Sequence, residues 1–335
     1  MTLGVQAIEA LTAGSAPAVW QHIAGEALSI CSAPLTKDKA TKSVTDRDRE
    51  IGKLDHFLAL SGWELWETFG ESVERTSDRL AKWWAGPYDA KAVLILDGLS
   101  LRELPWLLQG AEANGLKVTT IAASGSELPP ETNEFASALG YASRSQLQNN
   151  GGKSQRLPGA RTECVALPFA DCANLIDATP NWVFWHQWPD AAIHDAAGAG
   201  QGLDQIARET AERLTSDDFW NFVKRLAQGR SLVITSDHGY AATGLFHDAA
   251  DEQAQFLKDT FRSGRSRAGK SIGELDRGPF VPPVALPLES PHGAHLLALG
   301  RWKWKSQGGY PTLAHGGLSL LEVLCPFVEI SAAGA

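Results

Sequence analysis

Two short, uninterrupted apolar segments, each followed by an aspartate, constrain the fold of this chain more than any other feature. Residues 91–96 (KAVLIL) run directly into Asp97, and residues 231–235 (SLVIT) lead to the adjacent pair Asp237 and His238. Apolar runs of this length are typical of strands whose two faces are both buried, as in a parallel sheet covered by helices. Ligands of open α/β sheets bind beyond the carboxyl ends of the strands, so we expect these polar side chains to lie at a functional edge.

The sequence around these segments alternates between strand-like and helical patterns. The further elements that it predicts are strands at 118–123 and 181–184, and helices at 103–114, 131–139 and 203–226, the last with a candidate break near Thr215-Ser216. This alternation predicts an α/β fold with a mostly parallel sheet and helices on both faces. Residues 295–305 show a partial two-residue period and are predicted to form an added antiparallel strand.

Residues 1–88 contain no strand-like run and are predicted to form a small helical N-terminal unit. Helical spacing of apolar residues is clearest at 55–69 and 72–84, and the Gly86-Pro87 pair closes the unit. Residues 89–335 are then expected to form the α/β domain that carries the candidate site residues.

Two polar stretches, residues 143–161 and 248–277, interrupt the α/β pattern. Each follows an element that carries a candidate site residue, so we expect both insertions to lie near the mouth of the site. Basic side chains in these stretches would attract phosphate esters to an otherwise acidic protein. These side chains are Arg156, Arg161, Arg262, Arg265, Arg267 and Lys270.

The composition of the 335-residue chain excludes several classes of protein. Its net charge of −9 argues against a broad nucleic-acid surface, although not against a local site for a phosphate ester. No apolar run reaches the ~20 residues of a membrane span, and the first residues lack the basic start of a signal peptide. The four cysteines form no CxxC pair and are predicted to be reduced and mostly buried. We therefore expect a cytoplasmic protein without membrane contact.

Three further segments carry candidate chemistry. Asp190 and His194 are four residues apart, which places both side chains on one face if the segment is helical. His315 is followed by two glycines, which allow close backbone approach. Thr132 falls in the first turn of a predicted helix, where its hydroxyl could cap the helix, meet an anion or act as a nucleophile beside a metal.

The candidate residues divide into two groups with mixed nitrogen and oxygen donors. The first group is Asp97, Thr132, Asp237 and His238, and the second is Asp190, His194 and His315. Such donor sets suit zinc, with manganese as an alternative. Each signal also has a purely structural interpretation, namely a helix cap, a surface ion pair or a satisfied histidine in a glycine loop.

The order of these motifs resembles the alkaline phosphatase superfamily and, more narrowly, the PglZ domains of BREX phage-defence systems and of some response regulators. The motifs are IL-Asp97-Gly, LP-x-x-Thr132, Asp190-x-x-x-His194, IT-x-Asp237-His238-Gly and His315-Gly-Gly-x-Ser-x-x-Glu322-Val-x-x-Pro326. The resemblance covers roughly residues 90–330 and leaves the first 88 unexplained. Many PglZ domains have an arginine just after the first aspartate, whereas this chain has Ser100 there, with Arg102 nearby.

The resemblance implies an alkaline-phosphatase-like catalytic domain with two divalent metal ions and Thr132 as nucleophile. It implies a phosphodiesterase or nuclease of a phage-defence system that acts on a phosphoester such as a nucleic acid or a nucleotide. Other defence proteins are the partners that it suggests. Two alternatives stay open: a phosphomonoesterase or phosphomutase on the same scaffold, and a non-catalytic scaffold or adaptor in a defence complex.

Overall fold

The computed structural model describes residues 5–198, 202–306 and 309–332. Within them, one mixed sheet contains the strands β1 (Lys91–Leu96), β2 (Leu116–Gly125), β3 (Arg161–Val165), β4 (Asn181–His186), β5 (Ser231–Thr235) and β11 (Leu324–Ala332). Their order across the sheet is β2-β11-β5-β1-β4-β3. β1 pairs in parallel with β4 and β5, and β3 pairs in parallel with β4. β11 runs antiparallel to both β2 and β5, so the predicted mostly parallel sheet is confirmed with one inserted antiparallel strand.

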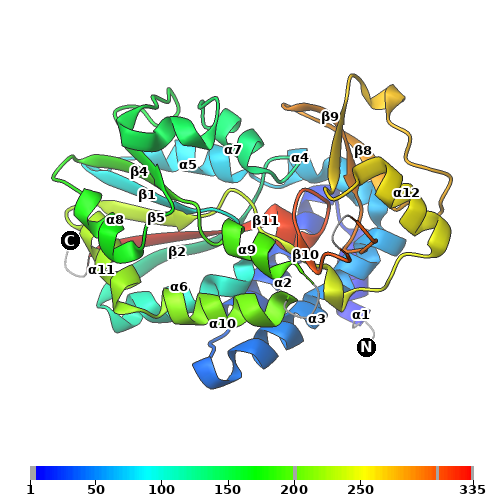
Figure 1. Cartoon of the computed structure of the whole chain (residues 1–335), viewed down its shortest axis with the longest axis horizontal. Coiled ribbons are helices and arrows are strands. Elements are labelled where there is room, and N and C mark those ends of the chain that lie inside the picture. The colour runs from blue at the N-terminus through cyan, green and yellow to red at the C-terminus, as the bar shows by residue number, and fades with distance from the viewer. Residues whose placement is uncertain (1–4, 199–201, 307–308, 333–335) are drawn as a thin grey trace.

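Helices cover both faces of this sheet (Figure 1). One face is covered by α5 (Thr76–Trp84) and α7 (Thr132–Ala138), and the other by α6 (Leu104–Ala113), α8 (Phe169–Leu175), α10 (Gly202–Leu214) and α11 (Asp217–Ala227). Val93 and Ile95 of β1 pack into the core on the α5 side, whereas Leu94 and Leu96 pack into the core on the α6 side. Because successive strand residues point to opposite faces, an uninterrupted apolar run finds a core on each side.

The N-terminal residues are helical as predicted, with α1 (Val5–Ala13), α2 (Ala16–Ser32), α3 (Ala40–Leu60) and α4 (Phe69–Ser72). The predicted helix over 55–69 is wrong in one respect, because α3 ends at Leu60. The backbone N–H groups of Ser61 and Gly62 both donate to the carbonyl of Phe57, which closes the helix before a short 3-10 segment. Likewise, the helix predicted from residue 72 begins at Thr76, as α5.

These N-terminal helices share one hydrophobic core with the sheet. α2 packs on α6 and β2, α3 packs on α10, and the buried side chains of Trp20, Ile23 and Leu54 belong to the same cluster as those of the strands. A buried ion-pair network adds to this packing, since Asp48 of α3 pairs with both Arg102 and Arg301. The N-terminal helices are therefore packed into the α/β core.

A smaller antiparallel sheet lies beside the main one (Figure 1). Within the described residues its order is β7-β9-β8, from β7 (Ser266–Gly269), β8 (Ala285–Ser290) and β9 (Gly293–Ala298), with α12 (Asp251–Phe261) packed against it. The antiparallel strand predicted over 295–305 corresponds to β9, which ends at Ala298 and belongs to this sheet. The remaining short elements are β6 (Ala241–Ala242), β10 (Leu313–Ala314), α9 (Asp190–Ala196) and α13 (Leu320–Val323).

The thiols are as the sequence predicts, since all four cysteines are free and buried in the described structure. The tryptophans also lie in the core, and all but Trp63 and Trp302 are buried. Among the residues that the structure describes, none of the helices combines the length and the apolar character needed to cross a membrane.

Candidate metal centre

All seven candidate residues meet at the carboxyl-terminal edge of the parallel strands. Asp97 follows β1, the Asp237-His238 pair follows β5, and Thr132 is the first residue of α7. Asp190 and His194 lie on α9, and His315 directly follows β10. Five separate segments thus converge, as expected when a parallel sheet brings its strand ends together.

The inner group is closed to solvent at its base. Asp97, Asp237 and His238 are 0 % exposed, and the hydroxyl Oγ1 of Thr132 lies 3.4 Å from both Asp97 Oδ1 and His238 Nε2. Asp237 Oδ1 accepts a hydrogen bond from the Gly98 N–H at 2.9 Å. His238 Nδ1 lies 2.9 Å from the Gly239 carbonyl oxygen, so a proton on Nδ1 leaves the lone pair of Nε2 facing Thr132 and the carboxylates.

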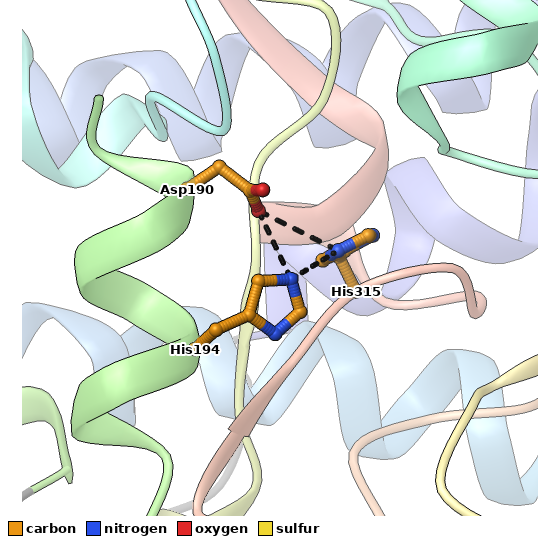
Figure 2. Close-up of side chains that lie close together, drawn as sticks. All are labelled: Asp190, His194 and His315. Atoms are coloured by element: carbon orange, nitrogen blue, oxygen red, sulfur yellow. Dashed lines mark hydrogen bonds and ion pairs between the residues drawn. The ribbon is translucent and has the colours of Figure 1, made fainter. Parts of the chain in front are cut away.

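The outer group is Asp190, His194 and His315 (Figure 2). Asp190 Oδ1 lies 3.4 Å from His194 Nε2 and 3.5 Å from His315 Nε2, and the two Nε2 atoms are 3.3 Å apart. The helix α9 confirms the one-face placement predicted for residues 190 and 194. The side chain of His194 is 60 % exposed, which makes the outer group the solvent-facing side of the cluster.

Asp190 links the two groups. One ligand atom from each of Asp97, Asp190 and His238 lies within 4.8 Å of the others, and the same holds for Asp190, His194 and His315. The spacing of residues 190 and 194 predicts that Asp190 belongs to the outer group alone. The structure instead puts its carboxylate within reach of both, because α9 begins directly beside the end of β1, where the Asp190 N–H donates to the Asp97 carbonyl.

The inner side chains are strongly perturbed by burial. Burial and the charge of Asp237 raise the pKa of Asp97 to about 8. Burial also raises the pKa of Asp237, and burial together with the charge of His315 lowers the pKa of His238. The inner carboxylates therefore repel one another in a place where little water can screen them.

The outer side chains show the opposite behaviour. Burial opposes ionisation of Asp190, but its close contact with the His194 imidazole and the charge of His315 hold the pKa of Asp190 well below its usual range. Burial disfavours a charged His315, yet Glu131 and Asp190 outweigh this effect and raise the pKa of His315 to about 10. The carboxylates of Asp190 and Glu131 thus favour positive charge on this side of the cluster.

The arrangement fits divalent cations. In the described residues, Asp237 Oδ2 and Asp190 Oδ1 are buried and accept no hydrogen bond, which is costly for a carboxylate oxygen. Both atoms face histidine Nε2 atoms at 3.4–3.5 Å. A cation between them would satisfy these oxygens and offset the repulsion among the buried carboxylates, and mixed imidazole and carboxylate donors suit zinc.

Arg144 is a site residue that sequence reasoning missed. It lies at the start of the 3-10 segment Arg144–Asn150, inside the predicted insertion 143–161, and its Nη1 pairs with Asp97 Oδ2. Trp185 Nε1 donates to the same carboxylate at 3.0 Å. Arg144 stays 29 % exposed and so remains open to a ligand, whereas Arg102 is buried and paired with Asp48. An arginine near the start of a polar insertion was the available signal.

The other basic residues expected at the mouth behave differently. Arg156 pairs with Asp78, and Arg161 pairs with Asp177 on the surface. Arg265 is 2 % exposed and forms an ion pair with Glu322. The second insertion still reaches the site, because Ser266 Oγ lies 3.3 Å from Glu131 Oε1.

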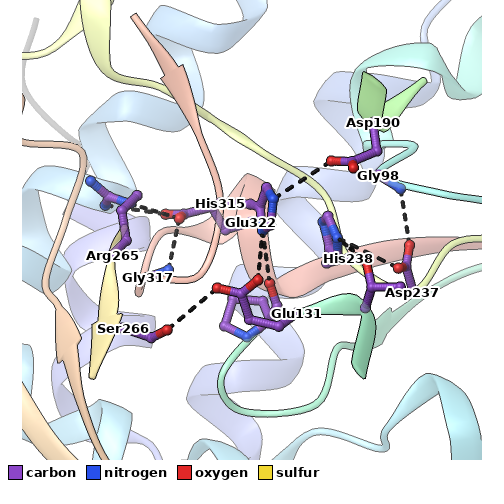
Figure 3. Close-up of polar contacts among 12 residues, drawn as sticks. Gly98, Glu131, Asp190, Asp237, His238, Arg265, Ser266, His315, Gly317 and Glu322 are labelled. Atoms are coloured by element: carbon purple, nitrogen blue, oxygen red, sulfur yellow. Dashed lines mark hydrogen bonds and ion pairs between the residues drawn. The ribbon is translucent and has the colours of Figure 1, made fainter. Parts of the chain in front are cut away.

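The Arg265–Glu322 pair fixes the tail motif that holds His315 (Figure 3). Glu322 Oε1 accepts hydrogen bonds from Arg265 Nε at 2.8 Å and from the Gly317 N–H at 2.9 Å. The backbone carbonyl of Glu322 accepts a bond from the Gly239 N–H, and a Cβ at Gly239 would lie 2.2 Å from the Leu321 carbonyl oxygen. The His315 loop and the Asp237-His238 loop are therefore built around the same short segment.

The chain was compared with known proteins. No protein-family model matches it. The search of curated proteins likewise finds no match.

Proposed function

We propose that this protein is a metal-dependent phosphoester hydrolase, a phosphodiesterase or nuclease of a phage-defence system, in which Thr132 is the nucleophile. The position of the Thr132 hydroxyl supports this most directly. It lies 3.4 Å from Asp97 Oδ1 and from His238 Nε2, in a cluster of carboxylates and imidazoles at the end of a parallel sheet. The motif order that resembles alkaline phosphatases and PglZ domains supports the same chemistry.

Six side chains would hold two divalent cations: Asp97, Asp237 and His238 on the inner side, and His194 and His315 on the outer side, with Asp190 shared between them. Such ions, when bound, lower the pKa of a hydroxyl and neutralise charge that develops on a phosphoryl group. The chain itself contributes the Thr132 oxygen, which is fixed at the first residue of α7.

Thr132 would then attack phosphorus, forming an oxygen–phosphorus bond as the ester oxygen leaves with a proton. Water hydrolyses the phosphothreonine and restores the hydroxyl. The side chains of His194 and Arg144 are 60 % and 29 % exposed, so both can meet an ester that enters from solvent. The guanidinium of Arg144 has the geometry to hold two phosphoryl oxygens.

The reaction class is tested with bis(4-nitrophenyl) phosphate beside 4-nitrophenyl phosphate, using zinc-loaded and manganese-loaded protein. We expect faster turnover of the diester. Faster turnover of the monoester would support a phosphomonoesterase on the same scaffold. Metal-loaded protein that cleaves neither ester, nor an oligonucleotide, would contradict the hydrolase proposal and favour an adaptor.

The chain is expected to bind two zinc ions, and Asp237→Ala and His315→Ala should each lose one of them together with activity. Removing a ligand leaves too few donors for a stable site. Elemental analysis after zinc loading and desalting measures the loss. Asp195→Ala is the matched control, because Asp195 lies next to His194 on α9 and is exposed.

Wild-type protein with well under one zinc ion per chain would overturn the two-metal centre. A variant that retained full zinc and full activity would show that the assignment at that residue is wrong.

Arg144→Ala is expected to raise KM for the diester about 10-fold or more, because hydrogen bonds to charged groups contribute ~1.5–3 kcal/mol and 1.4 kcal/mol is tenfold. Arg144→Lys should recover part of this loss, since it keeps the charge without the fork of donors. Steady-state kinetics and zinc content are measured on one preparation. Arg161→Ala, from the same insertion but paired with Asp177, should leave KM unchanged. An unchanged KM for Arg144→Ala would exclude its contact with substrate.

A further inference from the structure

Glu131 occupies a position that helix capping does not explain. It is the residue before α7, with extended backbone angles (φ −138°, ψ 149°), and its side chain makes no capping hydrogen bond in the described structure. Glutamate is also not among the side chains favoured at this position. Its carboxylate points instead toward the tail of the chain, with Oε2 lying 3.3 Å from His315 Nδ1 and Oε1 lying 3.3 Å from Ser266 Oγ (Figure 3).

The imidazole of His315 lies between Glu131 and the metal-binding groups. Its Nε2 atom faces Asp190 Oδ1 at 3.5 Å and His194 Nε2 at 3.3 Å. The opposite ring nitrogen, Nδ1, faces Glu131 and, at 3.4 Å, the carbonyl oxygen of Pro130. Only acceptors face Nδ1 among these contacts, so this nitrogen keeps a proton. Nε2 is then the ring nitrogen that can exchange its proton for a cation of the outer group.

The backbone after His315 is shaped around the same carboxylate. Gly316 has a φ of +101°, a region that favours glycine. A Cβ on Gly316 would lie 2.3 Å from Glu131 Oε1, so a side chain here would displace the carboxylate. Glu131 therefore lies where the His315 loop and Ser266 of β7 meet the start of α7.

We propose that Glu131 is a positioning residue that accepts the Nδ1–H of His315 and thereby directs Nε2 toward the outer metal ion. The inference rests on the proposed metal centre. It assigns the segment before the nucleophile a second role, because the residue that orients His315 is adjacent to Thr132. Ser266 contacts the carboxylate from the other side, so the insertion 248–277 reaches the site through this hydroxyl.

The role is tested by zinc affinity, measured on metal-free protein by competition with a chromophoric chelator. Glu131→Ala should weaken the outer site about 10- to 100-fold, the usual effect of removing a partner behind a ligating histidine. Glu131→Gln should lose less, because its amide oxygen can still accept from Nδ1. Gly316→Ala should resemble Glu131→Ala, since its methyl group takes the place of the carboxylate.

Glu134→Gln is the matched control, because Glu134 lies one turn further along α7 and has no hydrogen bond or ion pair to His315 in the described structure. Its zinc affinity should equal that of the wild type. ¹⁵N NMR of the histidine ring nitrogens gives a second readout. The Nδ1–H form of His315 should lose population in Glu131→Ala, whereas a purely structural role of Glu131 would leave that population unchanged.

The outcomes separate this inference from the proposed function. Wild-type protein that binds no zinc overturns both. Wild-type protein that binds two zinc ions, with Glu131→Ala and Gly316→Ala equally tight, overturns the role of Glu131 alone. A loss in Glu131→Gln as large as in Glu131→Ala would identify Glu131 as a direct ligand and also overturn its positioning role. If Glu131→Ala fails to fold, the zinc affinities of Glu131→Gln and Gly316→Ala test the proposal.

Discussion

Thr132→Ala should lose phosphoester turnover by about 10³-fold or more, the scale seen when a nucleophile is removed, while it keeps both metal ions and its fold. The substitution should change the stability of the fold very little. Thr132 is the first residue of α7, and in the described structure it serves no capping hydrogen bond, so its loss should cost ~1 kcal/mol or less. The Thr132 hydroxyl contacts only Asp97 and His238 in its hydrogen bonds there.

Thr132→Ser is the conservative comparison and should keep measurable activity, because a primary hydroxyl can still attack. Melting temperature and zinc content must be measured on the same preparation as turnover. If Thr132→Ala kept most of its activity with zinc in place, water would be the direct nucleophile and Thr132 only a positioning residue.

Asp48→Asn should lower the free energy of unfolding by ~3–5 kcal/mol, the cost of breaking a buried ion pair from one side. Asp48 is 0 % exposed and pairs with Arg102 and Arg301, which are themselves at most 4 % exposed. Burial disfavours a charged Asp48, but both guanidinium groups hold its pKa below the usual range, so it is ionised near neutral pH. The amide would leave Arg102 without the carboxylate with which it pairs.

The effect should extend to the metal centre. Arg102 Nη1 donates to the carbonyl of Tyr240 at 2.6 Å, and Tyr240 follows the Asp237-His238-Gly239 turn. Urea denaturation measures the stability, and zinc titration measures the centre. Asp46→Asn is the control on the same helix, because its pairing with Lys42 is exposed and worth under ~1 kcal/mol. Equal stability of the two variants would show that the buried network does not hold α3 to the core.

Several parts of the fold follow from local sequence alone. The runs at 91–96 and 231–235 form β1 and β5 within those residues, because each alternate side chain finds a core. The Asp190–His194 spacing forms one face of α9 as expected. The end of one predicted helix was wrong. The helix predicted over 55–69 stops at Leu60, because the backbone N–H groups of Ser61 and Gly62 both donate to the carbonyl of Phe57.

Other parts depend on pairings between distant segments. β11 inserts antiparallel between β2 and β5, a strand that the tail motif does not predict. β3 and β8 also escaped prediction, because their short runs gain stability from neighbouring strands. Strand order is a property of the assembled sheet, and no local pattern encodes it.

The candidate site divides in the same way. Local patterns in the sequence are enough to identify the candidate side chains, which are Asp97, Thr132, Asp190, His194, Asp237, His238 and His315. Three contacts are visible only in the folded chain: Asp190 reaches both groups, Arg144 pairs with Asp97, and Glu131 contacts His315 Nδ1. Periodicity and capping act between residues that are close in the sequence. These contacts instead join segments that are far apart in the sequence and meet only when the sheet and its loops pack together.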